Sequence, residues 1–289
     1  MNATFDPSAL RSEASLNRTV VGANPAFDLL SARAASTLVG GPGAEEVGRR
    51  VAALLATLKT GDPSTGLGME PTSWRQAYLA HWHTISCVWL GGGTTARLGS
   101  RLAPAVARHL DHLGIGGLTV RVADQPALLP LIGAARTLTT ATTAAVFDLG
   151  HSLVKRGVAC YEQGRLTAIH LRAPISLDVQ AMAEPEVINA VRSIVESTLD
   201  TTEPVDGVAI SVAAYLRDGE PADRHGAYGA LRSHHLARRP IWIHDGTAAG
   251  RAVPSRTRTA VVMLGTAIGV GFAPDPDTVA PAADDVAIG

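Results

Sequence analysis

Strand-length apolar runs alternate with amphipathic helical segments along most of this chain, and this alternation constrains the fold more than any other feature. Between residues 44 and 58, apolar residues recur at steps of three and four, as on one face of a helix. The run at 144–149, which is apolar except for Asp148, is typical of a buried strand. Because strands alternate with helices, we expect an α/β fold.

The remaining elements are predicted in the same way, with glycine and proline marking the breaks. We expect the C-terminal residues 275–289 to form a loose acidic tail. Helices are predicted over 74–85, 96–114, 128–141, 184–200 and 226–240, strands over 86–90, 117–124, 205–216 and 241–244, and paired strands over 144–161 and 259–273.

Composition excludes several classes of protein. The chain has 289 residues and a formal net charge of −1, without the basic clusters that nucleic-acid binding requires. Its apolar runs are too short to cross a membrane, and its N-terminus does not resemble a secretion signal. Cys87 and Cys160 lie in apolar runs, as buried reduced thiols do. We therefore expect a cytoplasmic protein of one or two domains, whose apolar helices also allow a homodimer.

Three glycine turns each follow an apolar strand: Gly91 to Gly93, Asp148 to Ser152, and Gly265 to Gly269. Glycine allows positive φ and close approach of the backbone to a ligand, and exposed N–H groups at such turns bind phosphate. A single turn of this kind is weak support, because most glycine turns are only turns. The chain has neither a Walker A sequence nor a complete G-x-G-x-x-G that opens a helix.

Two carboxylates stand where apolar strands end. Asp148 precedes Gly150, and Asp245 precedes Gly246 and a segment of high helix propensity. Each has a structural interpretation, Asp148 as a turn residue and Asp245 as a helix N-cap. Together they could hold Mg²⁺ and activate a hydroxyl group, which are requirements of phosphoryl transfer.

Five segments resemble motifs of the superfamily that joins actin, the heat-shock chaperone ATPases and sugar kinases. "FDLGHSLVKRGVA" resembles its first phosphate motif, and "VVMLGTAIGVGF" is similar to the second. "PIWIHDGTAAGRAV" resembles the catalytic-aspartate segment of ROK-type sugar kinases. "VWLGGGTTARLGSRLAPAVARHL" and "LLPLIGAARTL" resemble the adenosine motif and the closing helix. The resemblance implies a two-lobed actin-like ATPase (ribonuclease H-like) fold that binds ATP and Mg²⁺.

The motifs stand in an order that differs from the family order. The adenosine motif and the closing helix come first here, and reading residues 139–289 before 1–138 restores the family order. We infer a circular permutation, which proteins tolerate at termini and exposed loops. The resemblance then implies a nucleotide-binding lobe formed by residues 1–138 and 258–289. Residues 139–257 would form the lobe with the first phosphate motif and the catalytic aspartate.

The resemblance also implies roles for single residues. Asp245 would be the catalytic base that accepts the proton of the substrate hydroxyl, and Asp148 and Asp245 would hold Mg²⁺, partly through water. Gly91, Gly92 and Gly93 would flank the adenosine. The residues implied to lie at the phosphates are Asp148, Gly150, His151, Ser152, Lys155, Gly265, Thr266 and Gly269.

Departures from the family narrow the substrate. His151 replaces the usual second glycine of the first phosphate motif, and the sugar-binding Glu-x-Gly-His signature and the cysteine-rich zinc site are absent. A hexose is therefore disfavoured. Several polar residues could face a substrate or serve only as structural or solvated groups: His151, His225, His234, His235, His244, Arg217, Asp218 and Arg224.

The sequence thus predicts an ATP-dependent small-molecule kinase that phosphorylates a hydroxyl of a sugar, cyclitol, aminosugar or nucleoside-like metabolite. Two alternatives remain open. One is a non-catalytic ATP-binding sensor or assembly protein that kept the nucleotide site. The other is a Rossmann dehydrogenase, which needs a glycine turn that directly opens a helix. Gly91 to Gly93 is the one glycine turn that opens a predicted helix in this sequence.

Overall fold

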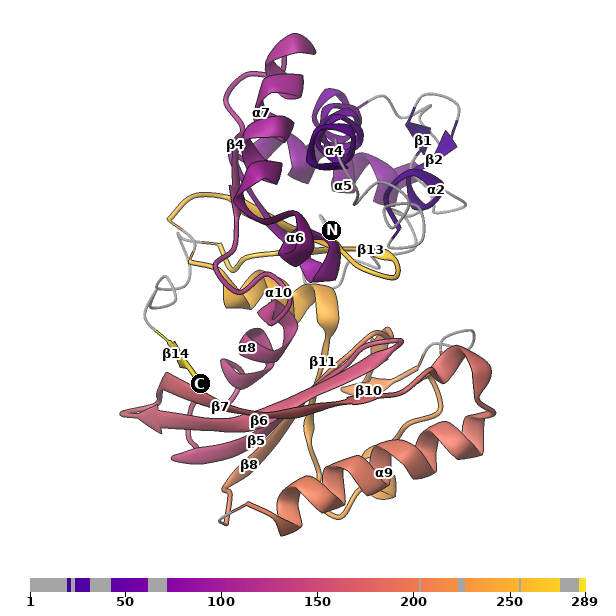
Figure 1. The fold of residues 1–289 in the computed structure, drawn as a ribbon, viewed down its shortest axis with the longest axis vertical. Coiled ribbons are helices and arrows are strands. Elements are labelled where there is room, and N and C mark those ends of the chain that lie inside the picture. The colour runs from indigo at the N-terminus through magenta and orange to yellow at the C-terminus, as the bar shows by residue number, and fades with distance from the viewer. Residues whose placement is uncertain are drawn as a thin grey trace. The chain divides into compact units, whose positions relative to one another are not determined.

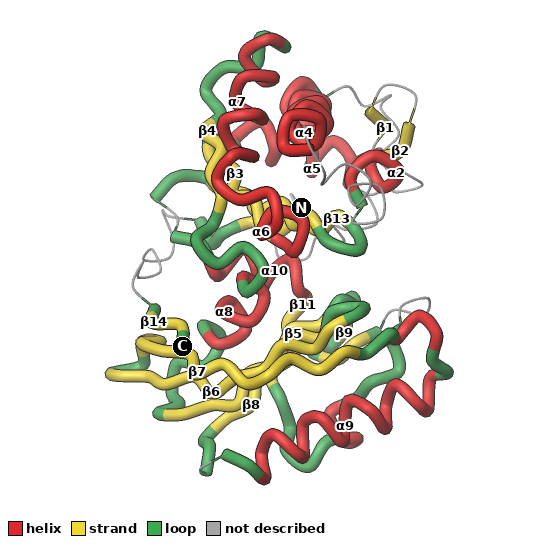
Figure 2. The backbone as a smooth tube through the Cα atoms, viewed as in Figure 1, coloured by secondary structure: helices red, strands yellow, loops and turns green. Residues whose placement is uncertain are grey.

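The computed structural model describes residues 20–21, 24–31, 43–61, 72–202, 204–222, 227–254, 256–275 and 286–289. The chain forms two compact units, the first from residues 1–129 and 255–281 and the second from 130–254 and 282–289. The sequence placed these divisions after residues 138 and 257 and assigned the C-terminal residues to the other unit. Both units combine helices with sheets that contain parallel strands, so the predicted α/β class is confirmed (Figures 1 and 2).

The sheet of the first unit has four strands among the described residues, in the order β13-β12-β3-β4. β12 and β13 form an antiparallel hairpin, whereas β3 runs parallel to both β12 and β4. This sheet contains β3 (Cys87–Gly91), β4 (Thr119–Val122), β12 (Thr259–Leu264) and β13 (Ile268–Phe272).

Helices pack against this sheet through their apolar faces. Leu54 and Leu58, on one such face, share a core with Leu90 and Val262 of the sheet. The helix predicted over 96–114 is broken at Gly99, whose φ of 64° is left-handed. The first unit also contains β1 (Val20–Val21), β2 (Asn24–Pro25), α2 (Ala26–Leu30), α4 (Gly43–Thr60), α5 (Thr72–Thr84), α6 (Gly92–Leu98), the 3₁₀ helix Gly99–Arg101 and α7 (Leu102–His112).

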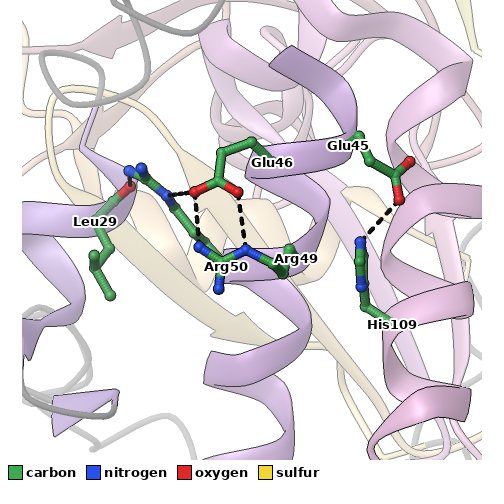
Figure 3. A network of polar contacts seen from close by, with 6 residues as sticks. All are labelled: Leu29, Glu45, Glu46, Arg49, Arg50 and His109. Atoms are coloured by element: carbon green, nitrogen blue, oxygen red, sulfur yellow. Dashed lines mark hydrogen bonds and ion pairs between the residues drawn. The ribbon is translucent and has the colours of Figure 1, made fainter. Parts of the chain in front are cut away.

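Polar contacts join α4 to its neighbours α2 and α7 (Figure 3). The Glu45 carboxylate lies 2.8 Å from Nε2 of His109 on α7. Arg50 donates through Nε to Glu46 at 2.7 Å and through a terminal nitrogen to the Leu29 carbonyl of α2 at 2.8 Å. The first turn of α4 is therefore fixed on both sides by charged groups.

The sheet of the second unit has the order β11-β8-β5-β6-β7-β14. β5, β6 and β7 form an antiparallel meander, and β8 and β11 continue the sheet in parallel with β5. Because β14 pairs with β7, the prediction that the C-terminal residues are loose is wrong for this segment. The strands are β5 (Thr143–Leu149), β6 (Leu153–Glu162), β7 (Arg165–Ser176), β8 (Gly207–Val212), β11 (Ile241–His244) and β14 (Ala287–Ile288).

The helix α9 (Glu184–Asp200) covers one face of this sheet (Figure 1). Its apolar residues, among them Val191, form a core with Phe147 and Ile210 of the strands. The unit also contains α10 (Asp245–Ala252) and most of α8 (Leu129–Ala135). A Cβ atom at Gly133 would lie 1.7 Å from the Ala248 carbonyl oxygen, so α8 and α10 pack with their backbones nearly in contact.

Residues 213–240, here called the crossover, join β8 to β11. A helix was predicted over 226–240, and this prediction is wrong for residues 227–240, which form turns and the 3₁₀ helix Ser233–His235. Side chains take the backbone groups that a helix would use. Arg232 donates to the carbonyls of Gly229 and Leu231, and the Glu220 carboxylate accepts the N–H of Ser233. The crossover also includes β9 (Leu216–Arg217) and β10 (Glu220–Pro221).

The helices of this protein are short or carry charged residues. The 18 residues of α4 include Glu45, Glu46 and Lys59, so its apolar residues form a stripe and not a continuous span. Among the described residues, no helix is long and apolar enough to cross a membrane.

Candidate functional site

Asp148 lies at the end of β5 and is buried, with 3% of its surface exposed. The neighbouring residues Phe147 and Leu149 belong to the core formed with α9, so alternation along the strand places Asp148 on the opposite face of the sheet. Burying a carboxylate is unfavourable unless charged or hydrogen-bonding partners accompany it. The neighbours of Asp148 must therefore stabilise its carboxylate in this buried position.

Two cross-strand neighbours bind the Asp148 carboxylate. Lys155, its register partner on β6, places Nζ 2.5 Å from Oδ2. Ser211, its register partner on β8, donates through its hydroxyl to Oδ1 at 3.3 Å. Each carboxylate oxygen thus has a protein donor, and the acid is held rigidly at the end of the strand.

The three-residue loop after Asp148 joins β5 to β6, and the protein binds each of its carbonyl groups. These carbonyls face donors from the crossover and from the segment that follows β7. The Gly150 carbonyl accepts from the Tyr228 hydroxyl at 2.6 Å, the His151 carbonyl from the Val179 N–H at 3.2 Å, and the Ser152 carbonyl from the Leu177 N–H at 3.1 Å.

The fixed carbonyls determine where the loop N–H groups point. In a trans peptide the C=O and the following N–H point in opposite directions, so the His151 and Ser152 N–H groups face away from the groups that bind Gly150 and His151. The Gly150 N–H closes the turn by donating to the Leu153 carbonyl at 3.2 Å. In the part of the chain that the structure describes, no protein acceptor takes the N–H of His151 or Ser152. Two oriented backbone donors of this kind suit an anion.

Asp245 is the first residue of α10 and follows directly after β11. Its side chain is 25% exposed, and its Oδ1 atom lies 3.3 Å from Nε2 of His244. The same oxygen accepts the N–H of Gly246, the next residue, at 2.6 Å. A capping side chain would instead accept the N–H of the second or third helical residue. The Tyr215 ring stacks on His244 with 5.6 Å between centroids. The N-cap position itself belongs to His244.

These groups meet at one edge of one sheet. β5, β8 and β11 are parallel, so their carboxyl ends lie at the same edge. Asp148 and the loop follow from β5, Ser211 stands near the end of β8, and Asp245 follows β11. In α/β sheets, ligands bind outside the carboxyl ends of the strands. The structure therefore brings Asp148, Gly150, His151, Ser152, Lys155 and Asp245 to the same edge.

The glycine turn at Gly91 to Gly93 lies in the first unit, where packing accounts for two of the three residues. A Cβ atom at Gly91 would lie 2.5 Å from the Met263 sulfur. Gly92 has φ of 91°, and a Cβ atom there would lie 2.4 Å from the Leu264 carbonyl oxygen. Gly93, by contrast, has no atom within 4 Å of such a Cβ. Only Gly93 lacks a packing explanation.

The turn predicted over Gly265 to Gly269 is shorter in the structure. The loop contains residues 265–267, and Gly269 lies inside β13 opposite Met263. The Gly265 N–H donates to the Ala267 carbonyl at 3.1 Å, and Thr266 is exposed at the tip. Thr266 is therefore in a position to meet a ligand, whereas Gly269 serves the strand.

The other polar residues named from the sequence lie in the crossover or outside the described residues. Arg217 and Asp218 are exposed at the β9–β10 turn. His234 and His235 lie in the 3₁₀ helix with their ring centroids 4.2 Å apart, and burial lowers the pKa of His235. His225 and Arg224 fall outside the residues that the structure describes.

A magnesium ion at this edge would depend on ligands other than protein side chains. The described residues contain no group of three or more His, Cys, Asp or Glu side chains that could hold a metal ion. Mg²⁺ commonly needs only one or two carboxylates when phosphates and waters complete its octahedron. Asp245 is exposed enough to bind directly or through water. Asp148, with both oxygens engaged, fits best through water.

Sequence reasoning missed two residues of this site, Ser211 and Tyr228. Ser211 becomes a neighbour of Asp148 only through the parallel pairing of β5 with β8, and Tyr228 lies in a segment predicted as helix. No family model matches this chain, and no curated protein matches its sequence. The geometry of the sheet edge is therefore the basis for a functional proposal.

Proposed function

We propose that this protein is an ATP-dependent kinase that transfers the γ-phosphate to a hydroxyl group of a small polar metabolite. The observation that carries the proposal is the β5–β6 loop, whose carbonyls are bound by the protein while no described residue accepts the N–H groups of His151 and Ser152. Backbone donors held in this way bind phosphate oxygens without reorganisation. Lys155 adds a positive charge, and Asp245 supplies a base at the same edge of the sheet.

The strand plan supports a permuted actin-like ATPase (ribonuclease H-like) fold. In the second unit an antiparallel meander is continued by two parallel strands, in the sheet order β11-β8-β5-β6-β7. The first unit repeats four of these positions as β4-β3-β12-β13. In the second unit the hairpin precedes the parallel strands in sequence, whereas in the first unit it follows them. A circular permutation of two similar lobes accounts for that reversal.

In the proposed reaction the substrate hydroxyl oxygen forms a bond to the γ-phosphorus while the bond to the bridging oxygen breaks and ADP leaves. Asp245 accepts the hydroxyl proton, and the His151 and Ser152 N–H groups and Lys155 stabilise the phosphate oxygens. Asp148 and Asp245 would hold Mg²⁺, partly through water, and the ion would supply positive charge to the phosphates.

ATP binding without phosphoryl transfer is the second candidate function, and one observation favours it. Both oxygens of Asp148 are bound by Lys155 and Ser211, so the carboxylate is occupied by the protein itself. A nucleotide-binding protein needs the phosphate loop but no base. The two candidates therefore differ in the role of Asp245.

The test is an ATP-consumption screen against sugars, cyclitols, aminosugars and nucleosides, run with the wild type and with Asp245→Asn. We expect at least one acceptor to stimulate consumption. Loss of the base should lower turnover about 10³-fold, within the usual range for general-base catalysis. The affinity for ATP without Mg²⁺, measured by calorimetry, should change less than about threefold, because Asp245→Asn leaves the loop intact.

The outcomes separate the candidates. ATP binding without stimulation by any acceptor would support the second candidate, and the absence of ATP binding would contradict both. A thermal-shift comparison of Mg-ATP with NAD is the control for a dehydrogenase, because a ligand of the native state raises the unfolding temperature. Stabilisation by NAD alone would contradict the kinase proposal.

A further inference from the structure

Tyr228 joins the crossover to the candidate phosphate loop. It is fully buried in the core beneath α9, and its hydroxyl lies 2.6 Å from the Gly150 carbonyl oxygen. We infer that Tyr228 is a positioning residue that orients the anion-binding N–H groups of the β5–β6 loop. This inference rests on the proposed function, because it assigns Tyr228 to the same phosphate site.

The planarity of one peptide group links Tyr228 to the His151 N–H. The Gly150 carbonyl and the His151 N–H belong to the same trans peptide, so fixing one fixes the other in the opposite direction. The bond from Tyr228 therefore determines where the His151 donor points. The Val179 N–H acts in the same way on the next peptide, by binding the His151 carbonyl at 3.2 Å.

Because residue 150 is a glycine, its peptide group needs the restraint that the Tyr228 hydrogen bond supplies. Gly150 has no side chain to limit its φ and ψ angles, so its peptide can rotate more freely than that of any other residue. A Cβ atom there would meet only the Leu153 carbonyl oxygen, at 3.0 Å, which leaves space around the loop. Without the Tyr228 hydroxyl, the Gly150 carbonyl would lose its protein donor and could turn outward. The His151 N–H would then turn inward, away from an anion.

The hydroxyl of Tyr228 is suited to be a permanent donor. Burial and the nearby negative charge of Asp148 raise its pKa, so the group stays protonated across the physiological range. A phenylalanine would fill the same space in the core but could not donate. The choice of tyrosine therefore serves the loop and not the packing alone.

The crossover reaches the base as well as the loop. Tyr215, near its start, stacks on His244, which precedes Asp245. Tyr228, further along the same segment, binds the loop. The crossover therefore contacts both the loop and the residue that precedes the proposed base.

The experiment compares Tyr228→Phe with the matched control Tyr161→Phe. Tyr161 is also buried in the second unit, and its hydroxyl donates to the Ala135 carbonyl at 2.7 Å, away from the loop. Each variant loses one buried hydroxyl bond to a backbone carbonyl. We expect calorimetry with inorganic tripolyphosphate and with ATP to show binding weakened about tenfold in Tyr228→Phe and changed less than about twofold in Tyr161→Phe.

A purely structural role for Tyr228 would lower the unfolding temperature of both variants and leave their anion affinities equal to that of the wild type. That result would overturn the inference but not the proposed function. If the wild type binds neither tripolyphosphate nor ATP, the proposed function fails, and the inference fails with it.

A second measurement does not depend on the stability of Tyr228→Phe. In the ¹⁵N-labelled wild type, tripolyphosphate should shift the amide resonances of His151 and Ser152 more than that of Gly150, whose N–H already donates to Leu153. Binding that moves neither resonance would overturn the assignment of the loop and of Tyr228.

Discussion

The two units contain hairpins at matching places in their sheets, β5–β6 in the second and β12–β13 in the first, yet only one hairpin carries charge. Asp148 stands two residues before the first loop glycine of β5–β6. Its register partners are Lys155 on the antiparallel neighbour and Ser211 on the parallel neighbour. All three side chains are joined by polar contacts.

Met263 occupies the same position in the first unit, two residues before Gly265. Its register partners are Gly269 on the antiparallel neighbour and Gly91 on the parallel neighbour. A Cβ atom at Gly91 would collide with the Met263 sulfur, so the thioether fills the space that side chains would need there. An acid, a lysine and a serine are thus replaced by a methionine and two glycines.

One backbone plan can thus hold either a charged site or an apolar contact. The loops differ in the same way. The three carbonyls of residues 150–152 are bound by other segments, whereas in loop 265–267 the described backbone bond is internal, from Gly265 to Ala267. We therefore expect anion binding to depend mainly on the loop of the second unit, and the apolar hairpin to contribute to stability.

In the first unit, a large effect on stability is expected at Gly92, whose backbone packs closely against β12. Gly92→Ala would place a Cβ atom 2.4 Å from the Leu264 carbonyl oxygen, at φ of 91°. We expect the free energy of unfolding to fall by about 3 kcal/mol, from the clash and the left-handed backbone together. Urea denaturation measures it.

Gly93→Ala is the matched control. Gly93 lies in α6 with open space around it, so alanine should raise the free energy of unfolding by roughly 0.5–1 kcal/mol through helix propensity. Equal destabilisation by the two variants would contradict the packing explanation.

A smaller loss in the free energy of unfolding is expected when the charge of Asp148 in the β5–β6 hairpin is removed. Asp148→Asn keeps the shape of the side chain but removes the charge that faces Lys155. Because Lys155 is 23% exposed and can turn toward water, we expect a loss of about 2 kcal/mol, below that for a fully buried pair. Met263→Leu, at the matching position, should cost less than about 1 kcal/mol as a swap of similar volume. Urea denaturation compares them, and a larger loss for Met263→Leu would reverse the comparison.

Local sequence patterns predicted the helices whose apolar residues recur at helical spacing. The apolar stripe of residues 44–58 became α4, and the helix expected over 184–200 became α9. The prediction was wrong over 227–240 because the Arg232 guanidinium donates to the Pro221 carbonyl and the Glu220 carboxylate accepts the Ser233 N–H, and no local period reveals these contacts. Tertiary hydrogen bonds outweighed helix propensity there.

From the sequence, only the part of the site that lies within one hairpin could be predicted. Asp148 and Lys155 stand close in sequence, on two strands of one hairpin, so the turn between them was visible. Ser211 was not, because parallel pairing joins residues that are distant in sequence. The packing of Gly91 and Gly92 was hidden for the same reason, because Met263 and Leu264, which lie against them, belong to β12, far along the chain.

The smallest effect is expected where charges lie on the surface of the first unit, in the pairs of Glu46 on α4. Hydrogen bonds from Arg49, then from Arg50, lower the pKa of Glu46 from 4.5 to about 2. A depressed pKa means that the ion pairs stabilise the fold fully above pH 4.5 and are lost as the pH falls towards 2. Because these side chains are partly exposed, Glu46→Gln should lower the free energy of unfolding by only about 0.5 kcal/mol at pH 7. The difference from the wild type, measured by urea denaturation, should shrink between pH 4.5 and 3, and a difference that stays constant with pH would show that packing, not charge, fixes this turn of α4.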